Sequence, residues 1–225
     1  MKDGFIKVAA GTPDVQVADC EFNASEIIKM VHEMEAEGAK VMVFPELCIT
    51  AYTCGDLFWQ ENLLEEAKKQ LFRIAEETKD VEALIFVGLP LEYKGKLYNV
   101  AAGLNHGEVL GFVPKIHIPN YNEFYEARYF TSGENVDGTV TVRTEDYGFC
   151  HMDELDDNDD VEFDLEAEIE ALEEAEFEEL EEVEDDPDYI DEDEEELMEQ
   201  DIPISSNVLF TCPDMPKLRI AAEIC

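Results

Sequence analysis

Apolar residues in the first half of the chain gather in short continuous runs. These runs occupy residues 5–10 (FIKVAA), 41–44 (VMVF) and 83–90 (ALIFVGLP). Each is bounded by turn-forming or polar residues, which predicts three buried strands. Two further runs, 97–104 and 107–115, are separated by a short polar turn, and this spacing predicts a β-hairpin.

Two longer segments between these runs carry apolar residues at helical spacing. The first begins near Asn23, which with Glu26 three residues later is typical of a capping box, and it ends at Gly38. The second covers residues 61–79. Strands that alternate with helices and then form a hairpin predict an α/β fold with a largely buried sheet.

Short apolar runs return at 207–212 and 218–225, after a long acidic tract. We therefore predict a folded domain built from residues 1–147 and 202–225, with residues 148–201 as an acidic, low-complexity insertion. Its apolar residues come close to helical spacing, whereas like charges four residues apart oppose a helix. Two interpretations stay open: a mobile, solvated segment, or a helix that docks on a basic partner.

The formal net charge of −42 is unevenly distributed. Of the 57 acidic residues, 30 lie between Asp153 and Asp201, so the other 27 face all 15 Lys and Arg residues. This balance argues against binding to nucleic acid or to an anionic membrane, because both need clustered basic residues. The sequence has no apolar run of about 18 residues and no secretory signal, and we expect a cytosolic protein.

The six cysteines show neither a paired metal-binding spacing nor the density of a disulfide scaffold. We expect no metal site, and we expect most of these cysteines to be reduced, buried thiols.

Three candidate reactive side chains each follow an apolar run: Glu46 after VMVFP, Lys115 after VLGFVP and Cys225 after LRIAAEI. Such strand ends meet in a crevice at one edge of an α/β sheet. A carboxylate can take the thiol proton, and an ammonium can favour the thiolate and stabilise an oxyanion, which suits acyl transfer from an amide through a thioester. Taken singly, the three are more typical of a helix-cap or surface glutamate, a solvated lysine and an inert buried cysteine.

The motifs FPELCITAYTCGDLF, PKIHIPNYNEFYEARYF and AAEIC together resemble the carbon-nitrogen hydrolase (nitrilase) superfamily, and within it the glutaminase domain of glutamine-dependent NAD+ synthetases. The resemblance covers residues 1–147 and 202–225. It implies a nitrilase-type α-β-β-α sandwich, incomplete here because the family's motif continues after the cysteine. The interval from Lys115 to Cys225 is longer than the family's, and the acidic insertion accounts for the excess.

By position, the resemblance implies that Glu46 is the general base, Lys115 the oxyanion stabiliser and Cys225 the nucleophile. It also implies that Tyr121 lines the glutamine pocket and that Glu123 is the second glutamate, which helps to hold the substrate amide. Glu126 is a further neighbour. A structural role for the last three stays open.

The implied function is hydrolysis of glutamine, with the ammonia passed to a synthetase domain of the same chain that uses ATP and Mg2+ to convert deamido-NAD+ to NAD+. That domain would be missing here, and no cofactor is predicted in this segment. We expect the intact enzyme to be a homo-oligomer and this chain alone to be inactive, because it lacks the backbone amide after Cys225. The alternatives are another amidase or carbamoylase of the superfamily and a non-catalytic acidic binding protein.

Overall fold

The computed structural model describes four stretches of the chain: residues 5–143, 199–206, 209–212 and 215–221. They belong to one compact unit, which is formed by Met1–Gly148 and Met198–Cys225. The second unit, Phe149–Leu197, contains most of the predicted acidic insertion and lies outside the described residues. Cys225 lies outside them as well.

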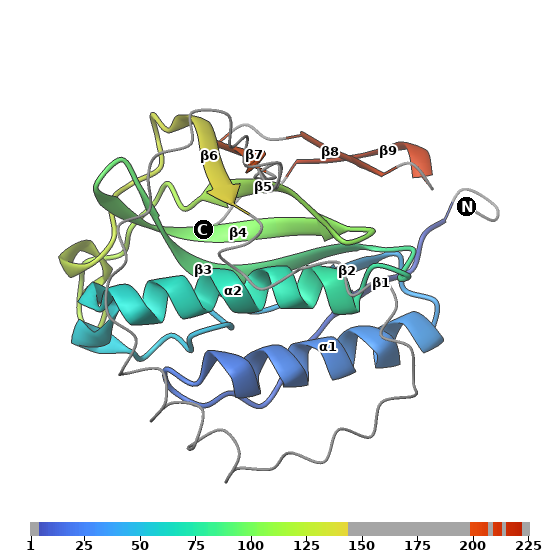
Figure 1. Ribbon diagram of the computed structural model, residues 1–225, viewed down its shortest axis with the longest axis horizontal. Helices are drawn as coiled ribbons and strands as arrows, with labels where there is room; N and C mark the ends of the chain where they lie inside the picture. The colour runs from blue at the N-terminus through green and yellow to red at the C-terminus, as the bar shows by residue number, and fades with distance from the viewer. Residues whose placement is uncertain (1–4, 144–198, 207–208, 213–214, 222–225) are drawn as a thin grey trace, which may run out of the picture. The chain divides into compact units, whose positions relative to one another are not determined.

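Seven strands form one mixed sheet in the order β1-β2-β3-β4-β5-β7-β6 (Figure 1). They are β1 (Val8–Ala10), β2 (Val41–Val43), β3 (Leu84–Tyr93), β4 (Lys96–Asn105), β5 (Glu108–Pro114), β6 (Asp137–Arg143) and β7 (Glu199–Ser205). The β1–β2 and β2–β3 pairs are parallel, and the β3–β4 and β4–β5 pairs are antiparallel. Because of these two reversals, β5 runs in the same direction as β2, and their carboxyl ends lie at the same edge of the sheet.

Helices α1 (Cys20–Ala36) and α2 (Glu61–Glu77) lie side by side along one face of this sheet (Figure 1). The predicted start of α1 was wrong. Its N-cap is Asp19, whose carboxylate accepts a hydrogen bond from the Phe22 backbone N–H at 3.0 Å. Asn23 is instead fully buried inside the helix, and its amide donates to the Ile49 carbonyl oxygen at 2.9 Å. Tertiary contacts therefore use the residue that local sequence assigned to a cap.

The predicted hairpin between β4 and β5 is confirmed. Asn105 pairs with Glu108, and the two turn residues between them, His106 and Gly107, have φ values of 48° and 81°. Positive φ at both central positions is the geometry of a tight hairpin turn, which glycine adopts without steric cost. The α/β class predicted from the alternation of strands and helices is confirmed with it.

The sheet buries apolar side chains on both faces. Met42 points to the core under the helices, whereas the preceding Val41 belongs to a second cluster on the opposite face. In that cluster Phe210 of β8 (Leu209–Cys212) packs edge-on against Phe86, with ring centroids 5.1 Å apart. β8 forms an antiparallel pair with β9 (Met215–Ala221). This pair therefore begins a second layer on the sheet face that the helices leave open.

Strands β6 and β7 are not among the elements that the sequence predicts. β7 begins at Glu199, inside the range 148–201 that the sequence assigns to the insertion, and it pairs with β5 through Phe112 and Ile204. Ile202 and Ile204 are fully buried, whereas Asp201 is exposed. This alternation is typical of a strand, but the acidic run before it hides the pattern.

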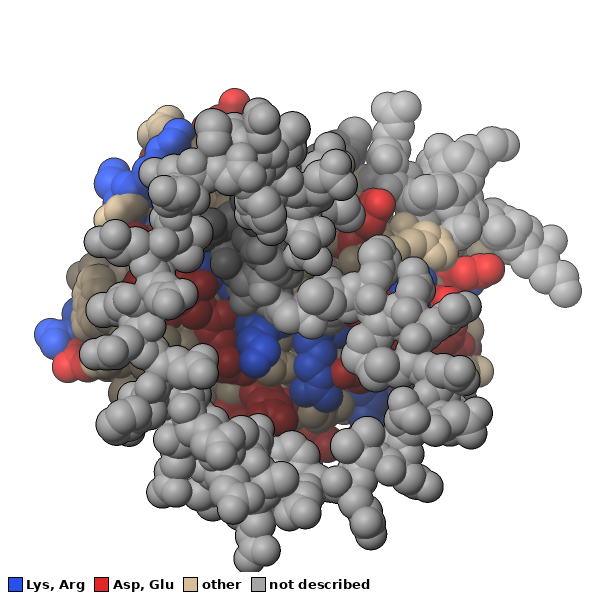
Figure 2. All heavy atoms as spheres, viewed as in Figure 1, with Lys and Arg blue, Asp and Glu red and all other residues tan. Residues whose placement is uncertain are grey.

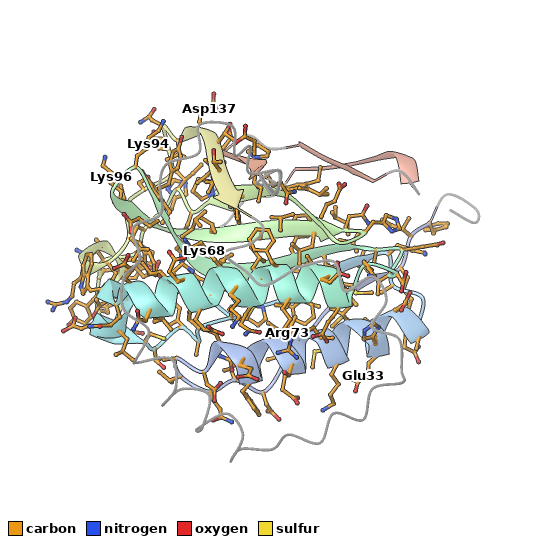
Figure 3. All side chains as sticks on the ribbon, in the orientation of Figure 1. Glu33, Lys68, Arg73, Lys94, Lys96 and Asp137 are labelled. Carbon is orange, nitrogen blue, oxygen red and sulfur yellow. The ribbon has the colours of Figure 1, made fainter. Side chains whose placement is uncertain are left out.

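Acidic and basic side chains are interspersed on the face of the described residues that the helices form (Figure 2). Along α2, Lys68 pairs with Glu65 and Arg73 with Glu77, and both basic residues project from the helix in Figure 3. Such exposed pairs contribute little to stability. No helix within the described residues combines the length and the apolar character needed to cross a bilayer.

The packing of α2 gives a prediction for stability. Leu71 is fully buried between α2 and the sheet, so Leu71→Ala is expected to lower the free energy of unfolding by about 2–5 kcal/mol because it leaves a cavity. Exposed Lys69 on the same helix is the matched control, and Lys69→Ala is expected to change it by less than about 0.5 kcal/mol. Urea unfolding followed by circular dichroism measures both values, and equal losses would contradict this packing.

Candidate active site

The loop after β2 carries Glu46, and its position depends on a glycine of the neighbouring strand. A Cβ atom on Gly88 of β3 would lie 2.4 Å from the Leu47 backbone nitrogen and 2.8 Å from the Pro45 carbonyl oxygen. The Ile49 backbone N–H also donates to the Gly88 carbonyl oxygen at 3.2 Å. Only glycine allows this close approach of two backbones. The loop is therefore held against β3, and Glu46 stands at the edge where β5 also ends.

Lys115 follows β5 and meets Glu46 at this edge. Its Nζ donates to Glu46 Oε1 at 2.6 Å and to the two carboxylate oxygens of Glu126 at 3.2 and 3.0 Å. The side chains of Lys115 and Glu126 are only 3% and 6% exposed, whereas that of Glu46 is 30% exposed. The structure thus brings together Glu46 and Lys115, as the sequence predicts, and adds Glu126 as a second carboxylate on the same ammonium.

Two uncharged side chains complete the contacts of this group. The Tyr52 hydroxyl donates to Glu126 Oε1 at 2.7 Å. Asn99, in the middle of β4, donates from Nδ2 to Glu46 Oε1. Each carboxylate therefore accepts hydrogen bonds from Lys115 and from one neutral donor.

The balance of charge keeps Lys115 protonated. Burial by itself lowers the pKa of Lys115, but the hydrogen bonds and charges of Glu46 and Glu126 outweigh it, so that the pKa is raised above its ordinary value. Burial and the hydrogen bond to Glu126 also raise the pKa of Tyr52. The site at neutral pH therefore contains a fixed ammonium and a neutral phenol.

These side chains lie at the wall of a cavity of about 580 Å³. The residues that line this cavity are Glu46, Tyr52, Lys115, Ile116, His117, Ile118, Pro119, Tyr121, Phe124 and Glu126. A volume of this size is typical of a pocket for a small molecule. Polar groups that converge on one side of a partly apolar cavity can orient such a ligand and stabilise charge on it.

The remaining predicted residues are placed differently. Tyr121 lines the cavity and is 63% exposed. Glu123 is exposed and lines a smaller neighbouring cavity of about 180 Å³. The buried glutamate that contacts Lys115 is Glu126, whereas Glu123 has no place in the larger cavity. Cys225 lies outside the described residues.

Sequence reasoning missed Tyr52 and Asn99, although both carried a signal. Tyr52 belongs to the motif FPELCITAYTC that contains Glu46. Asn99 is a polar residue within the apolar run LYNVAAGL, and it is 1% exposed in β4. A buried polar residue in a central strand needs a partner, which could have pointed to the site.

The described residues contain no group of three or more His, Cys, Asp or Glu side chains that could hold a metal ion. Cys20, Cys48 and Cys54 are free and buried. Burial raises the pKa of Cys20 and of Cys48 to about 12, so these thiols stay protonated at neutral pH. They have the inert character that the sequence predicts for most cysteines, and neither is a candidate nucleophile.

Replacing the buried ammonium tests its part in the fold. Lys115→Met leaves Glu126 buried without its charged partner, and we expect the free energy of unfolding to fall by about 3 kcal/mol. Lys40→Met is the matched control, because Lys40 pairs with Glu82 at 2.9 Å on the surface and should cost less than about 1 kcal/mol. Urea unfolding measures both, and a Lys115→Met loss no larger than the control would contradict the burial described.

The raised pKa of Lys115 gives a prediction for alkaline pH. A group with a raised pKa in the folded state stabilises the fold below its unfolded pKa, here about 10.5, and this contribution is lost as pH rises through the folded value. The stability difference between wild type and Lys115→Met should therefore be constant from pH 7 to about pH 10 and shrink above it. Thermal unfolding at a series of pH values checks this, and a difference that grows above pH 10 would contradict it.

The sequence profile of the carbon-nitrogen hydrolase family matches residues 7–149. A glutamine-dependent NAD(+) synthetase from Mycobacterium tuberculosis is 35% identical over 146 residues, which are 65% of this chain and 22% of that protein. The chain thus spans about a fifth of the length of the curated relatives that it matches.

Among solved structures, a glutamine-dependent NAD(+) synthetase from Cytophaga hutchinsonii has a TM-score of 0.65 and 22% identity, over 96% of this chain and 27% of that chain. An amidase from Nesterenkonia sp. AN1, with acrylamide added at its active-site cysteine, has a TM-score of 0.50 and 21% identity, over 60% of this chain and 53% of that chain. At these identities the structures show a shared fold. Together with the profile match, they confirm the family resemblance seen in the sequence: the chain belongs to the carbon-nitrogen hydrolase family.

Proposed function

We propose that this chain supplies the glutaminase part of a glutamine-dependent NAD+ synthetase. The observation that carries the proposal is the buried ammonium of Lys115 held between Glu46 and Glu126 at the wall of a cavity of about 580 Å³. Synthetases of this name are homologous to the N-terminal part of the chain. Glutamine is the proposed substrate on that basis.

In the proposed reaction the Cys225 thiol gives its proton to Glu46, and the sulfur attacks the amide carbon of glutamine. Lys115 faces the negative charge that develops on the amide oxygen. Ammonia leaves with the proton returned by Glu46. Water, deprotonated by the same carboxylate, then hydrolyses the thioester to glutamate and regenerates the thiol.

Glu126 is the better candidate for the second glutamate than Glu123. Glu126 is buried, contacts Lys115 and lines the larger cavity as well as the smaller one, whereas Glu123 is exposed and lines only the smaller one. A carboxylate at that position can hold Lys115 in place and accept a hydrogen bond from the substrate amide. We therefore move to Glu126 the role that the sequence resemblance gives to Glu123.

The ammonia would be used by an ATP- and Mg2+-dependent synthetase domain in a longer polypeptide. The greater length of the homologous synthetases supports this. A small amide other than glutamine is the alternative substrate, supported by the shared fold of the Nesterenkonia amidase. Assays with glutamine and with short aliphatic amides separate the two, because a glutaminase should release ammonia from glutamine at a far higher kcat/KM.

The matched pair Glu126→Gln and Glu123→Gln tests the assignment of the second glutamate. In a polypeptide that extends beyond residue 225, Glu126→Gln should lower kcat/KM for glutamine about 100-fold, because Lys115 and the amide lose a charged partner. Glu123→Gln should lower it less than about threefold. Ammonia release measures both, and equal losses would contradict the assignment.

The nucleophile is tested in the same assay. Cys225→Ala should abolish ammonia release in the longer polypeptide, because it removes the sulfur that attacks the amide. Clear turnover by the Cys225→Ala protein would overturn the proposed function.

A further inference from the structure

Asn99 is a buried amide whose side chain makes one hydrogen bond among the described residues, and that bond is to the proposed base. It lies in the middle of β4, is 1% exposed, and donates from Nδ2 to Glu46 Oε1. Burying an amide in a central strand is unfavourable unless its polar atoms are paired. Packing alone therefore does not explain why an asparagine occupies this position in the strand.

The sheet register places Asn99 beside Lys115. The Lys115 backbone N–H donates to the Asn99 carbonyl oxygen at 2.8 Å, which extends the β4–β5 pairing one residue past Val100 and Pro114. Residues directly opposite each other in an antiparallel pair have side chains on the same face. Asn99 and Lys115 therefore approach Glu46 from two adjacent strands.

Both donors bind the same oxygen of Glu46. Oε1 accepts from Lys115 Nζ at 2.6 Å and from Asn99 Nδ2. Within the part of the chain that the structure describes, no hydrogen bond involves Oε2, and the Glu46 side chain keeps 30% exposure and lines the cavity. Oε1 is therefore held by two donors, whereas Oε2 can accept a proton or a hydrogen bond from a ligand.

We propose that Asn99 is a positioning residue: together with Lys115 it fixes Glu46 Oε1, so that Oε2 is the atom that accepts the proton of the nucleophile. The role of Oε2 in proton transfer rests on the proposed function. The two hydrogen bonds that hold Oε1 are independent of it.

The other end of the Asn99 amide supports this assignment. Among the described residues, Asn99 Oδ1 is the buried side-chain oxygen or nitrogen that lacks a hydrogen-bond partner. Turning the amide over would place Oδ1 against the Glu46 carboxylate, and two acceptors repel. The amide orientation is therefore set by the need to donate to Glu46, at the cost of an unpaired acceptor.

Asn105, in the same strand, provides a contrast. It is also buried, and its Nδ2 donates to the Ala83 carbonyl oxygen at 3.0 Å. That bond joins a side chain to backbone, and no titratable group takes part in it. Asn105 is therefore a matched control for the loss of a buried amide at the other end of β4.

The anchored geometry can be tested on the 225-residue chain without any assay of activity. In a sample labelled with 15N at asparagine, the Asn99 side-chain amide resonances should shift as Glu46 is protonated at low pH. Those of buried Asn23, whose described side-chain hydrogen bonds all join backbone groups, should not. Glu46→Gln should make the Asn99 shifts independent of pH. Asn99 resonances that titrate no more than those of Asn23, or that still titrate in Glu46→Gln, would overturn the inference.

The catalytic part is tested by kinetics in the longer polypeptide. Asn99→Leu keeps the side-chain size and removes the donor, so the low-pH limb of the kcat/KM profile should move up by about one pH unit. We expect kcat to fall about tenfold with KM changed less than twofold. Asn105→Leu should leave the limb in place even if it lowers stability.

A low-pH limb unchanged in Asn99→Leu would overturn the positioning role. The two experiments separate this inference from the proposed function. If the Asn99 resonances titrate with Glu46 but the longer polypeptide does not hydrolyse glutamine, the anchored geometry stands and the glutaminase assignment fails.

Discussion

The buried ammonium of Lys115 is the constraint around which the rest of the site is arranged. A charge that is 3% exposed is costly unless it is paired, and here two carboxylates and the hydrogen bonds behind them compensate for the loss of water. Glu46 is the more exposed of the two partners, and Glu126 the more buried. The same arrangement that stabilises the ion pair leaves one carboxylate accessible from the cavity, and this division suits a base beside a fixed positive charge.

The sheet makes this meeting possible. β2 and β5 run in the same direction, with the antiparallel β3–β4 hairpin between them, so residues 46 and 115 reach one edge although they are distant in sequence. Gly88 in β3 then lets the loop after β2 approach the sheet backbone closely. Asn99, in the intervening strand β4, binds Glu46 through its side chain and Lys115 through its backbone carbonyl oxygen. Each strand from β2 to β5 thus contributes to the position of Glu46 or Lys115.

Local sequence patterns, which involve residues close together in the chain, predicted most of the secondary structure. Helical spacing, continuous apolar runs and a two-residue hairpin turn predicted α1, α2, the central strands and the β4–β5 hairpin. The predicted start of α1 was wrong because Asn23, a residue type that often caps helices, makes a buried tertiary hydrogen bond instead. β6 and β7 were missed because their pairing joins segments on either side of the acidic tract, and their short alternation is obscured by it.

By itself, the sequence determined the family resemblance through its three motifs and placed Glu46 and Lys115 at strand ends, because strand boundaries follow from local pattern. That the two side chains meet depends on the strand directions in the assembled sheet. Only the tertiary structure decided which of two nearby glutamates meets Lys115, and that Tyr52 and Asn99 belong to the same group. Glu123 and Glu126 are alike in composition and close in sequence. What distinguishes them is burial, which depends on how residues far apart in the chain pack together and not on the identity of the neighbouring residues.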